Sequence, residues 1–172
     1  MRIEDQEARD RARLSLGKNI VVEAGAGTGK TTLLTDRILF SLLAGPGKGT
    51  EVSRIVALTF TEKAAGEIKL RLSSKLSDLL AVIDGRPLPE KRLKAARLWL
   101  EEALEHFGRS PEDVRKDADA AVNALDRVMI GTIHHFAAHV LRLHPIEAGV
   151  DPSFEVDEGE AFEELFAAQW AL

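Results

Sequence analysis

Residues 19–32 have the sequence NIVVEAGAGTGKTT, and this stretch decides the fold. The apolar run Asn19–Glu23 predicts a buried strand, which is followed at once by a glycine-rich turn. Residues 30–43 then carry apolar side chains at helical spacing, and Pro46 lies in the glycine-rich segment that ends this helix. The order of strand, glycine loop and helix predicts a phosphate-binding loop.

The residue types in this loop suit phosphate chemistry. Backbone N–H groups of a tight loop reach a phosphate only where no side chain intrudes, and Gly25, Gly27 and Gly29 meet that demand. Lys30 can reach the β- and γ-phosphates, and the hydroxyl of Thr31 can hold Mg²⁺. The alternative is that the glycines form only a turn, but the flanking strand and helix favour a phosphate loop.

Strands and helices alternate along most of the chain. Strands are predicted at 19–23, 54–60 and 128–131, and helices at 4–16, 30–43, 62–80, from 133 to Pro145, and from Gly159 onward. This alternation predicts an α/β fold, a P-loop NTPase (RecA-like) parallel sheet flanked by helices. Two helices between residues 81 and 127 interrupt it and are interpreted as a helical insertion, the second with Ser110 as its N-cap.

Two of the predicted helices have an apolar stripe that we expect to be buried. In the helix over residues 62–80 the stripe consists of Ala65, Ile68, Leu72, Leu76 and Leu79. In the helix that Thr132 caps it consists of Ile133, Phe136, Val140 and Leu141.

Composition bounds the class of protein. With 172 residues, 45% of them hydrophobic, the chain can form one packed domain, and no apolar run is long enough to span a bilayer. The N-terminus does not resemble an export signal, so we expect a cytoplasmic protein. The absence of cysteine excludes disulfides and thiolate metal sites. A net charge of −5 argues against coating of nucleic acid, so any DNA contact must be local.

Four sequence blocks resemble the UvrD/Rep/RecB/AddA family of superfamily 1 DNA helicases. They are Asp5-Gln6, the loop AGAGTGKTT at residues 24–32, LTFTEKAA at residues 58–65, and GTIHHF at residues 131–136. In the last block His135 stands where the family usually has serine. Segments at residues 144–149 and 154–158 are similar to the stretch that leads, in the RecB/AddA branch, toward an inserted subdomain, expected here at about 145–172.

The resemblance implies two sets of site residues. The nucleotide, ATP with Mg²⁺, is expected to contact Gln6, Ala24, Gly25, Ala26, Gly27, Thr28, Gly29, Lys30, Thr31 and Thr32. Among these, Gln6 corresponds to the adenine-reading glutamine, Lys30 and Thr31 to the catalytic pair, and Thr31 to the magnesium ligand. Single-stranded DNA is expected to contact Thr59, Phe60, Thr61, Lys63, Thr132 and His134, with a base on Phe60 and phosphates near the polar side chains.

The acidic motif required for ATP hydrolysis, an apolar strand ending in Asp-Glu, is not evident. The nearest candidate, Phe154–Glu158, is interpreted as a turn that enters a helix. Residues 1–172 are therefore expected to be the N-terminal portion of the ATP-binding domain of an ATP-driven DNA helicase or helicase-nuclease. The expected partners are single-stranded DNA, a second RecA-like domain and a partner helicase-nuclease subunit, with no membrane. Two alternatives stay open, a freestanding P-loop kinase or small ATPase and a non-catalytic P-loop binding module.

Overall fold

The computed structural model describes residues 5–25, 27–156 and 166–169. The predicted loop residue Ala26, the acidic pair Asp157 and Glu158, and most of the helix expected from Gly159 lie outside the described residues. Contacts along the chain divide it into a first unit, Met1–Gly131, and a second unit, Thr132–Leu172.

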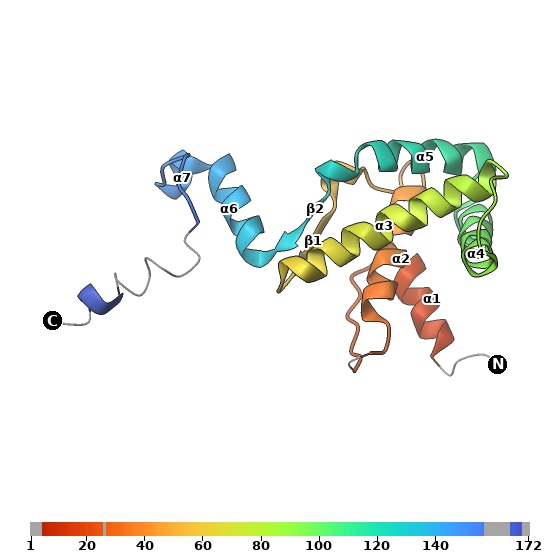
Figure 1. Cartoon of the computed structure of the whole chain (residues 1–172), viewed down its shortest axis with the longest axis horizontal. Coiled ribbons are helices and arrows are strands. Elements are labelled where there is room, and N and C mark those ends of the chain that lie inside the picture. Colours follow the sequence, from red (N-terminus) through yellow and green to blue (C-terminus); the bar gives the residue numbers. More distant parts are fainter. Residues whose placement is uncertain (1–4, 26, 157–165, 170–172) are drawn as a thin grey trace. The chain divides into compact units, whose positions relative to one another are not determined.

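Helices dominate the described residues (Figure 1). The first unit contains α1 (Gln6–Leu14), α2 (Lys30–Leu43), α3 (Glu62–Ile83), α4 (Glu90–Phe107) and α5 (Pro111–Asn123), with 3-10 turns at Val52–Arg54 and Leu125–Arg127. The second unit contains α6 (Ile133–Leu143) and the short α7 (Pro145–Ala148). The helices predicted within residues 4–16, 30–43 and 62–80 are confirmed, as are the two helices in the predicted insertion.

Helix α3 carries the core of the first unit. The predicted stripe is buried along its whole length, and Leu72, Leu76 and Leu79 have no exposed surface. Helices α2, α4 and α5 and the first strand all pack on α3, which runs through the middle of the first unit (Figure 1). The two helices of the predicted insertion thus belong to the same hydrophobic core as the phosphate-loop helix α2.

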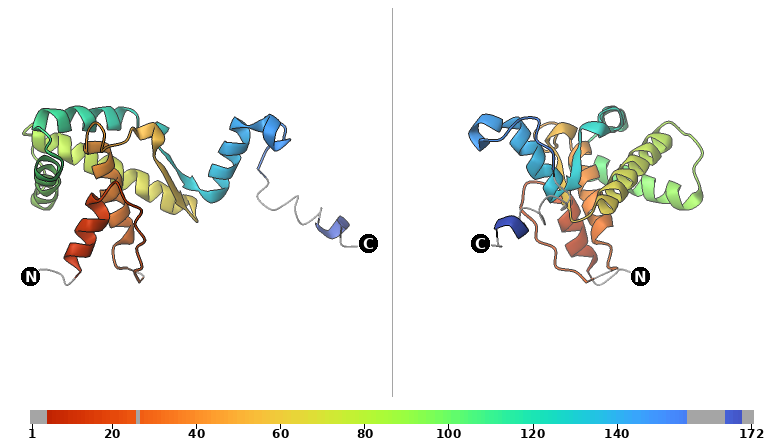
Figure 2. Two further views of the ribbon diagram at one scale, coloured as in Figure 1. Left: turned by 180° about the vertical axis from the view of Figure 1, so that it is seen from behind. Right: turned by 60° about the vertical axis from the view of Figure 1, so that its left-hand side comes forward.

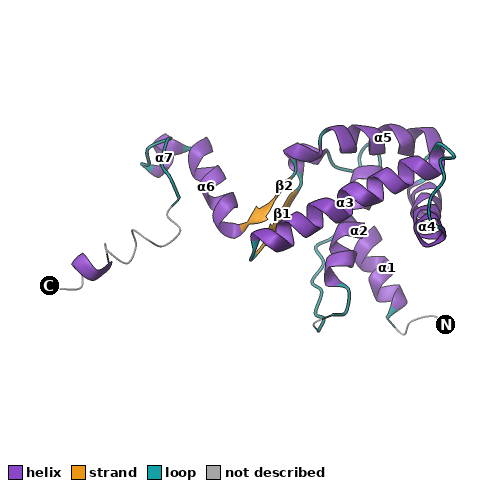
Figure 3. Ribbon diagram, viewed as in Figure 1, coloured by secondary structure: helices purple, strands orange, loops and turns teal. Residues whose placement is uncertain are grey.

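The sheet in the described residues consists of two strands, β1 (Val56–Thr59) and β2 (Met129–Thr132) (Figure 3). They run parallel, joined by the crossover through α3, α4 and α5. The prediction of a strand within residues 54–60 is confirmed, although its first residue, Arg54, is the last residue of a 3-10 turn. Ala57 is buried, whereas Val56 and Leu58 on the opposite face are 50% and 42% exposed.

The buried strand predicted at Asn19–Glu23 is wrong for this structure. These residues form no strand, and Val21 is 88% exposed. A parallel strand needs a neighbour for its backbone N–H and C=O groups, and neither strand of the described sheet pairs with this segment. Instead, the apolar segment belongs to the connection from α1 to α2 and lines a cavity between these two helices.

Three hydroxyl side chains cap helices where the sequence places polar residues at a helix start. Ser110 accepts a hydrogen bond from the backbone N–H of Asp113 at 3.1 Å, and Thr61 accepts one from Ala64 at 3.2 Å. In the second unit Thr132 accepts one from His135, also at 3.2 Å. The predicted caps at Ser110 and Thr132 are confirmed, and each satisfies a backbone N–H that has no partner within its helix.

Arg37 of α2 ties α1 to the phosphate-loop helix. Its guanidinium donates to the backbone carbonyl oxygens of Ala12, Ser15 and Lys18 at 2.6, 3.2 and 3.0 Å. The carbonyls of Ala12 and Ser15 lie at the C-terminal end of α1, where the helix leaves its last acceptors without partners and where a cation is favourable, and that of Lys18 lies in the loop that follows. Helix α1 accordingly lies along α2, as the views in Figures 1 and 2 show.

The second unit departs from the prediction of a buried face on α6. The helix is present and ends before Pro145 as expected, but Ile133, Val140 and Leu141 are 48%, 39% and 36% exposed. Ala138 is the buried residue of α6. Besides α6, the described part of the second unit consists of the short α7, a loop and one helical turn at residues 166–169, and the apolar face of α6 stays partly exposed among them.

The core on α3 leads to a stability prediction. We expect Leu76→Ala to lower the free energy of unfolding by about 2–5 kcal/mol, because it removes fully buried methyl groups and leaves a cavity. Leu70→Ala on the same helix, where the side chain is 69% exposed, is the control and should change it by less than about 0.5 kcal/mol. Equal urea midpoints for the two variants would contradict this account of the core.

Candidate functional site

The glycine loop bends into α2 through two left-handed residues. Gly27 has φ 75° and Gly29, the N-cap of α2, has φ 89°. Side chains rarely adopt this conformation because Cβ crowds the following carbonyl oxygen, so glycine is required for the backbone rather than for lack of space. At Gly29 an added Cβ would be 3.7 Å from the Arg9 guanidinium, an ordinary contact.

Side chains of the loop fold back on its own carbonyl groups. The Lys30 ammonium group donates to the carbonyl oxygens of Ala24, at 2.8 Å, and Gly25. The hydroxyl of Thr28 donates to the carbonyl oxygen of Gly25 at 2.8 Å. Lys30 is therefore held over the loop, with its charge at the N-terminal end of α2 where backbone N–H groups of the first turn are without helical partners.

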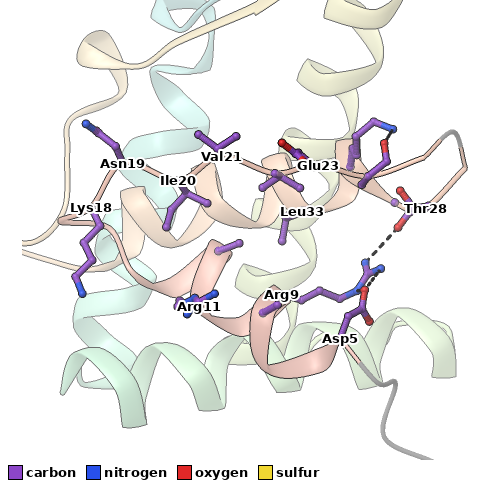
Figure 4. A pocket seen from close by; sticks show the side chains of 16 residues that line it. Asp5, Arg9, Arg11, Lys18, Asn19, Ile20, Val21, Glu23, Thr28 and Leu33 are labelled. Carbon is purple, nitrogen blue, oxygen red and sulfur yellow. Dashed lines mark hydrogen bonds and ion pairs between the residues drawn. The ribbon is translucent and has the colours of Figure 1, made fainter.

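A cavity of about 490 Å³ opens beside this loop, between α1, α2 and the segment 18–24. Arg9 extends across it from α1 (Figure 4): its Nη1 donates to the carbonyl oxygen of Thr28 at 3.2 Å, and its Nε donates to Asp5 at 2.9 Å. The hydrogen bond from Arg9 lowers the pKa of the Asp5 carboxyl and raises the pKa of Arg9. The pair thus stays ionised and links α1 to the loop.

Sequence reasoning missed Arg9 and Asp5 as residues of this cavity. The available signal was their spacing of four residues on a predicted helix, which places opposite charges side by side, but nothing in the sequence said which way that face pointed. Gln6, predicted to read the adenine, lines a different cavity, between α1, α2 and α4. There its Nε2 donates to Asp10 at 2.9 Å. Thr32 lines that second cavity too, and Thr31 lies half-buried in the first turn of α2.

The loop after β1 presents an exposed aromatic ring. Phe60 is 91% exposed, although an aromatic residue at a strand end more often joins the core. Thr59 beside it turns inward, where its hydroxyl donates to the carbonyl oxygen of Thr61 at 2.9 Å and lies 3.4 Å from that of Gly131. The ends of β1 and β2 are therefore neighbours, and the ring of Phe60 projects from the loop that follows one of them.

The remaining residues predicted to contact DNA are placed at helix starts. Lys63 is exposed in the first turn of α3, next to the cap Thr61. Thr132 directly follows Gly131 and caps α6, and His134 is exposed in the first turn of that helix. Thr61 and Thr132 accordingly have a structural role in capping, whereas Phe60, Lys63 and His134 have side chains available to a ligand.

Two further properties concern the described residues only. No described helix has the length and apolar character needed to cross a membrane. In the same part of the chain, no three His, Cys, Asp or Glu side chains are grouped closely enough to hold a metal ion by themselves.

The first unit thus combines a glycine loop whose lysine begins α2 with a strand end that is followed by an exposed aromatic residue. Residues 5–170 match the family model described as the UvrD/REP helicase N-terminal domain. The match covers nearly the whole chain, and the chain belongs to this family. The mostly helical fold with its small parallel sheet is thus a RecA-like fragment.

Similar proteins support the same assignment. The chain is 34% identical over 163 residues to the A subunit of an ATP-dependent helicase/nuclease from Pelotomaculum thermopropionicum, covering 90% of this chain and 10% of that protein. It is 32% identical to the protein of the same name from Lactobacillus gasseri, covering 91% and 10%, and 30% identical to the one from a Thermoanaerobacter species, covering 96% and 12%. The chain spans about a tenth of the length of these relatives.

The loop conformation leads to a second prediction. Gly29→Ala should lower the free energy of unfolding by about 1–2 kcal/mol, since alanine must adopt a left-handed φ. Gly17→Ala is the matched control: no atom lies within 4 Å of its added Cβ and its φ is not left-handed, so it should cost less than about 0.5 kcal/mol. If urea unfolding gives the two variants the same stability, the loop does not require glycine at position 29.

Proposed function

We propose that this chain binds the phosphates of Mg²⁺-ATP or ADP at residues 24–32, as the N-terminal part of the ATP-binding domain of a DNA helicase or helicase-nuclease. The observation that carries the proposal is the left-handed glycine loop that leads into the N-terminus of α2, with the Lys30 ammonium held against the carbonyl oxygens of the same loop. In this proposal α4 and α5 are an insertion of the domain, and a second RecA-like domain closes the nucleotide cleft from the other side. A partner helicase-nuclease subunit completes the assembly.

Phosphate binding follows from exchange of hydrogen bonds at Lys30. The carbonyl oxygens of Ala24 and Gly25 accept from its ammonium group, and phosphate oxygens are stronger, charged acceptors for the same donors. The backbone N–H groups of the loop and the first turn of α2 add donors that need no side-chain rearrangement. Lys30 therefore gains a charge-assisted contact with phosphate in exchange for its hydrogen bonds to the loop carbonyl oxygens.

The residues of the loop also fit a magnesium ion delivered with the nucleotide. Thr31 places a hydroxyl in the first turn of α2, one residue after the phosphate-binding lysine. A hydroxyl is a hard oxygen ligand of the kind Mg²⁺ accepts, and the ion takes its other ligands from phosphate and water. When bound, Mg²⁺ neutralises charge on the β- and γ-phosphates. Thr31 would hold it and Lys30 would orient the phosphates.

The third prediction tests the nucleotide site. Lys30→Ala should weaken Mg²⁺-ADP binding by roughly tenfold or more, because a hydrogen bond to a charged group contributes about 1.5–3 kcal/mol. Lys48→Ala is the control, since Lys48 is exposed in the turn after α2 and does not line the cavity. Titration calorimetry that gives the same affinity for wild type and Lys30→Ala would refute the phosphate-loop assignment.

A second part of the proposal concerns single-stranded DNA. We infer that single-stranded DNA contacts the loop Thr59–Lys63 of the first unit, and that Thr132 and His134 of the second unit are further DNA contacts. The exposed ring of Phe60 and the exposed side chains of Lys63 and His134 support this. A base can stack on the ring regardless of its identity, while Lys63 meets a phosphate, so binding should show little sequence preference. With a net charge of −5, the affinity should be weak and limited to low salt.

The fourth prediction separates stacking from charge. Phe60→Ala should weaken binding of a labelled oligothymidylate at low salt by about tenfold, since stacking of a base on an aromatic ring contributes about 1–3 kcal/mol. Phe60→Trp retains an aromatic face and should bind at least as well as wild type. Both variants should bind Mg²⁺-ADP normally. Unchanged fluorescence anisotropy curves for Phe60→Ala would remove Phe60 from the proposed DNA contact.

Two other functions make different predictions for the same measurements. A freestanding P-loop kinase or small ATPase would bind Mg²⁺-ADP but not single-stranded DNA. A non-catalytic module would bind nucleotide, and the bound nucleotide would not change the affinity of the module for DNA. The exposure of Phe60 at the end of a strand favours the helicase proposal over a freestanding kinase or small ATPase, which needs no aromatic ring in solvent there.

A further inference from the structure

Helix α6 of the second unit (Figure 1) carries two histidines one turn apart. His135 lies in its first turn and His139 follows four residues later, and both side chains are exposed. Residues four apart on an α-helix lie on the same face, with Cβ atoms roughly 5–6 Å apart. The helix therefore brings two imidazole rings to one place on the surface of this unit.

The fold of α6 does not account for the imidazole ring of His135. The residue takes part in the helix start through its backbone N–H, which donates to the hydroxyl of Thr132 at 3.2 Å. Serine, the usual residue of the resembled family at this position, supplies the same backbone donor. Within the described residues, neither His135 nor His139 uses its ring in a hydrogen bond, an ion pair or a ring contact. Both rings are therefore available to a ligand.

Two exposed imidazole rings at this spacing suit a transition-metal ion. Imidazole nitrogen is a common ligand of Zn²⁺, Ni²⁺ and Cu²⁺, and two histidines four residues apart on a helix can bind zinc from one face. Zinc takes nitrogen ligands at about 2.0–2.1 Å, so a tetrahedral ion holds two of them roughly 3.3 Å apart. The ring nitrogens extend beyond Cβ, and exposed rings reach such a separation by rotation of their side chains.

The charged groups of α6 do not compete for this position. The helix has no acidic residue, and its one arginine, Arg142, lies three residues after His139. The guanidinium of Arg142 is engaged by Phe154, with its carbon 4.9 Å from the ring centroid and its Nη2 donating to the backbone carbonyl oxygen at 3.3 Å. No third His, Cys, Asp or Glu of the described residues joins the pair, so the other positions of a bound ion are open to water.

We propose that His135 and His139 form a two-histidine site for a transition-metal ion of the zinc and nickel class, with solvent in its remaining positions. The site differs in chemistry from the magnesium position proposed at Thr31, because Mg²⁺ prefers oxygen ligands whereas imidazole suits the later transition metals. It does not depend on the proposed nucleotide function. An ion held by both rings bridges one turn of α6, so its binding should stabilise this helix.

Calorimetric titration of the whole chain with Zn²⁺, in excess Mg²⁺ and without nucleotide, tests the pair. His135→Ser and His139→Ala should each weaken Zn²⁺ binding by about tenfold or more, because even the outer partners of metal ligands contribute roughly 10–100-fold to affinity. His134→Ala is the matched control, since residue 134 lies about 100° around the helix from residue 135 and should leave binding unchanged. Equal affinities of the wild type, His135→Ser and His139→Ala for Zn²⁺ would overturn the proposal.

Hydrogen exchange locates the bound ion by an independent measurement. Zn²⁺ should slow the exchange of backbone N–H groups in α6 of the wild type, because an ion bound only to the folded helix stabilises it, and should leave α3 unchanged. Without Zn²⁺, the wild type and His135→Ser should exchange alike, which shows that the variant keeps its fold. Zn²⁺ that binds the wild type without slowing α6, or that slows α6 equally in His135→Ser, would contradict the site.

Discussion

Burial of the apolar face of α3 is the constraint on which the rest of the first unit depends. Helices α2, α4 and α5 pack around α3 and so remove Leu72, Leu76 and Leu79 from water. Strand β1 precedes α3 in the chain and also packs against it. At about 25 cal/mol for each Å² of buried apolar surface, this helix supplies much of the driving force for the unit. The glycine loop is positioned by it indirectly, because α2 is fixed against α3.

The sequence alone predicted the features that local chemistry controls. Apolar spacing located α2 and α3, and serine or threonine at a helix start identified the caps at Ser110 and Thr132. The glycines of the loop were predicted from phosphate chemistry, and the left-handed φ angles of Gly27 and Gly29 supply a backbone reason for two of them. These features depend on neighbours within a few residues, so a linear pattern is enough to find them.

The features that depend on distant neighbours were not predictable in this way. Asn19–Glu23 has the composition of a strand, yet a strand forms only where another lies beside it. The face of α1 that borders the loop, with Asp5 and Arg9, depends on how that helix packs against α2. Gln6 has a residue type suited to reading a base, but which cavity it lines is a tertiary property.

The three hydrogen bonds from Arg37 to the end of α1 have a mechanical consequence. A guanidinium that bridges Ala12, Ser15 and Lys18 resists separation of α1 from α2 along more than one direction. The two helices should therefore tend to move together, so that a displacement of α2 at the glycine loop is passed on to α1. Since Arg13 of α1 holds Glu102, the same displacement pulls directly on α4. A displacement of the loop would therefore also act on α4, which begins sixty residues after Lys30 in the sequence.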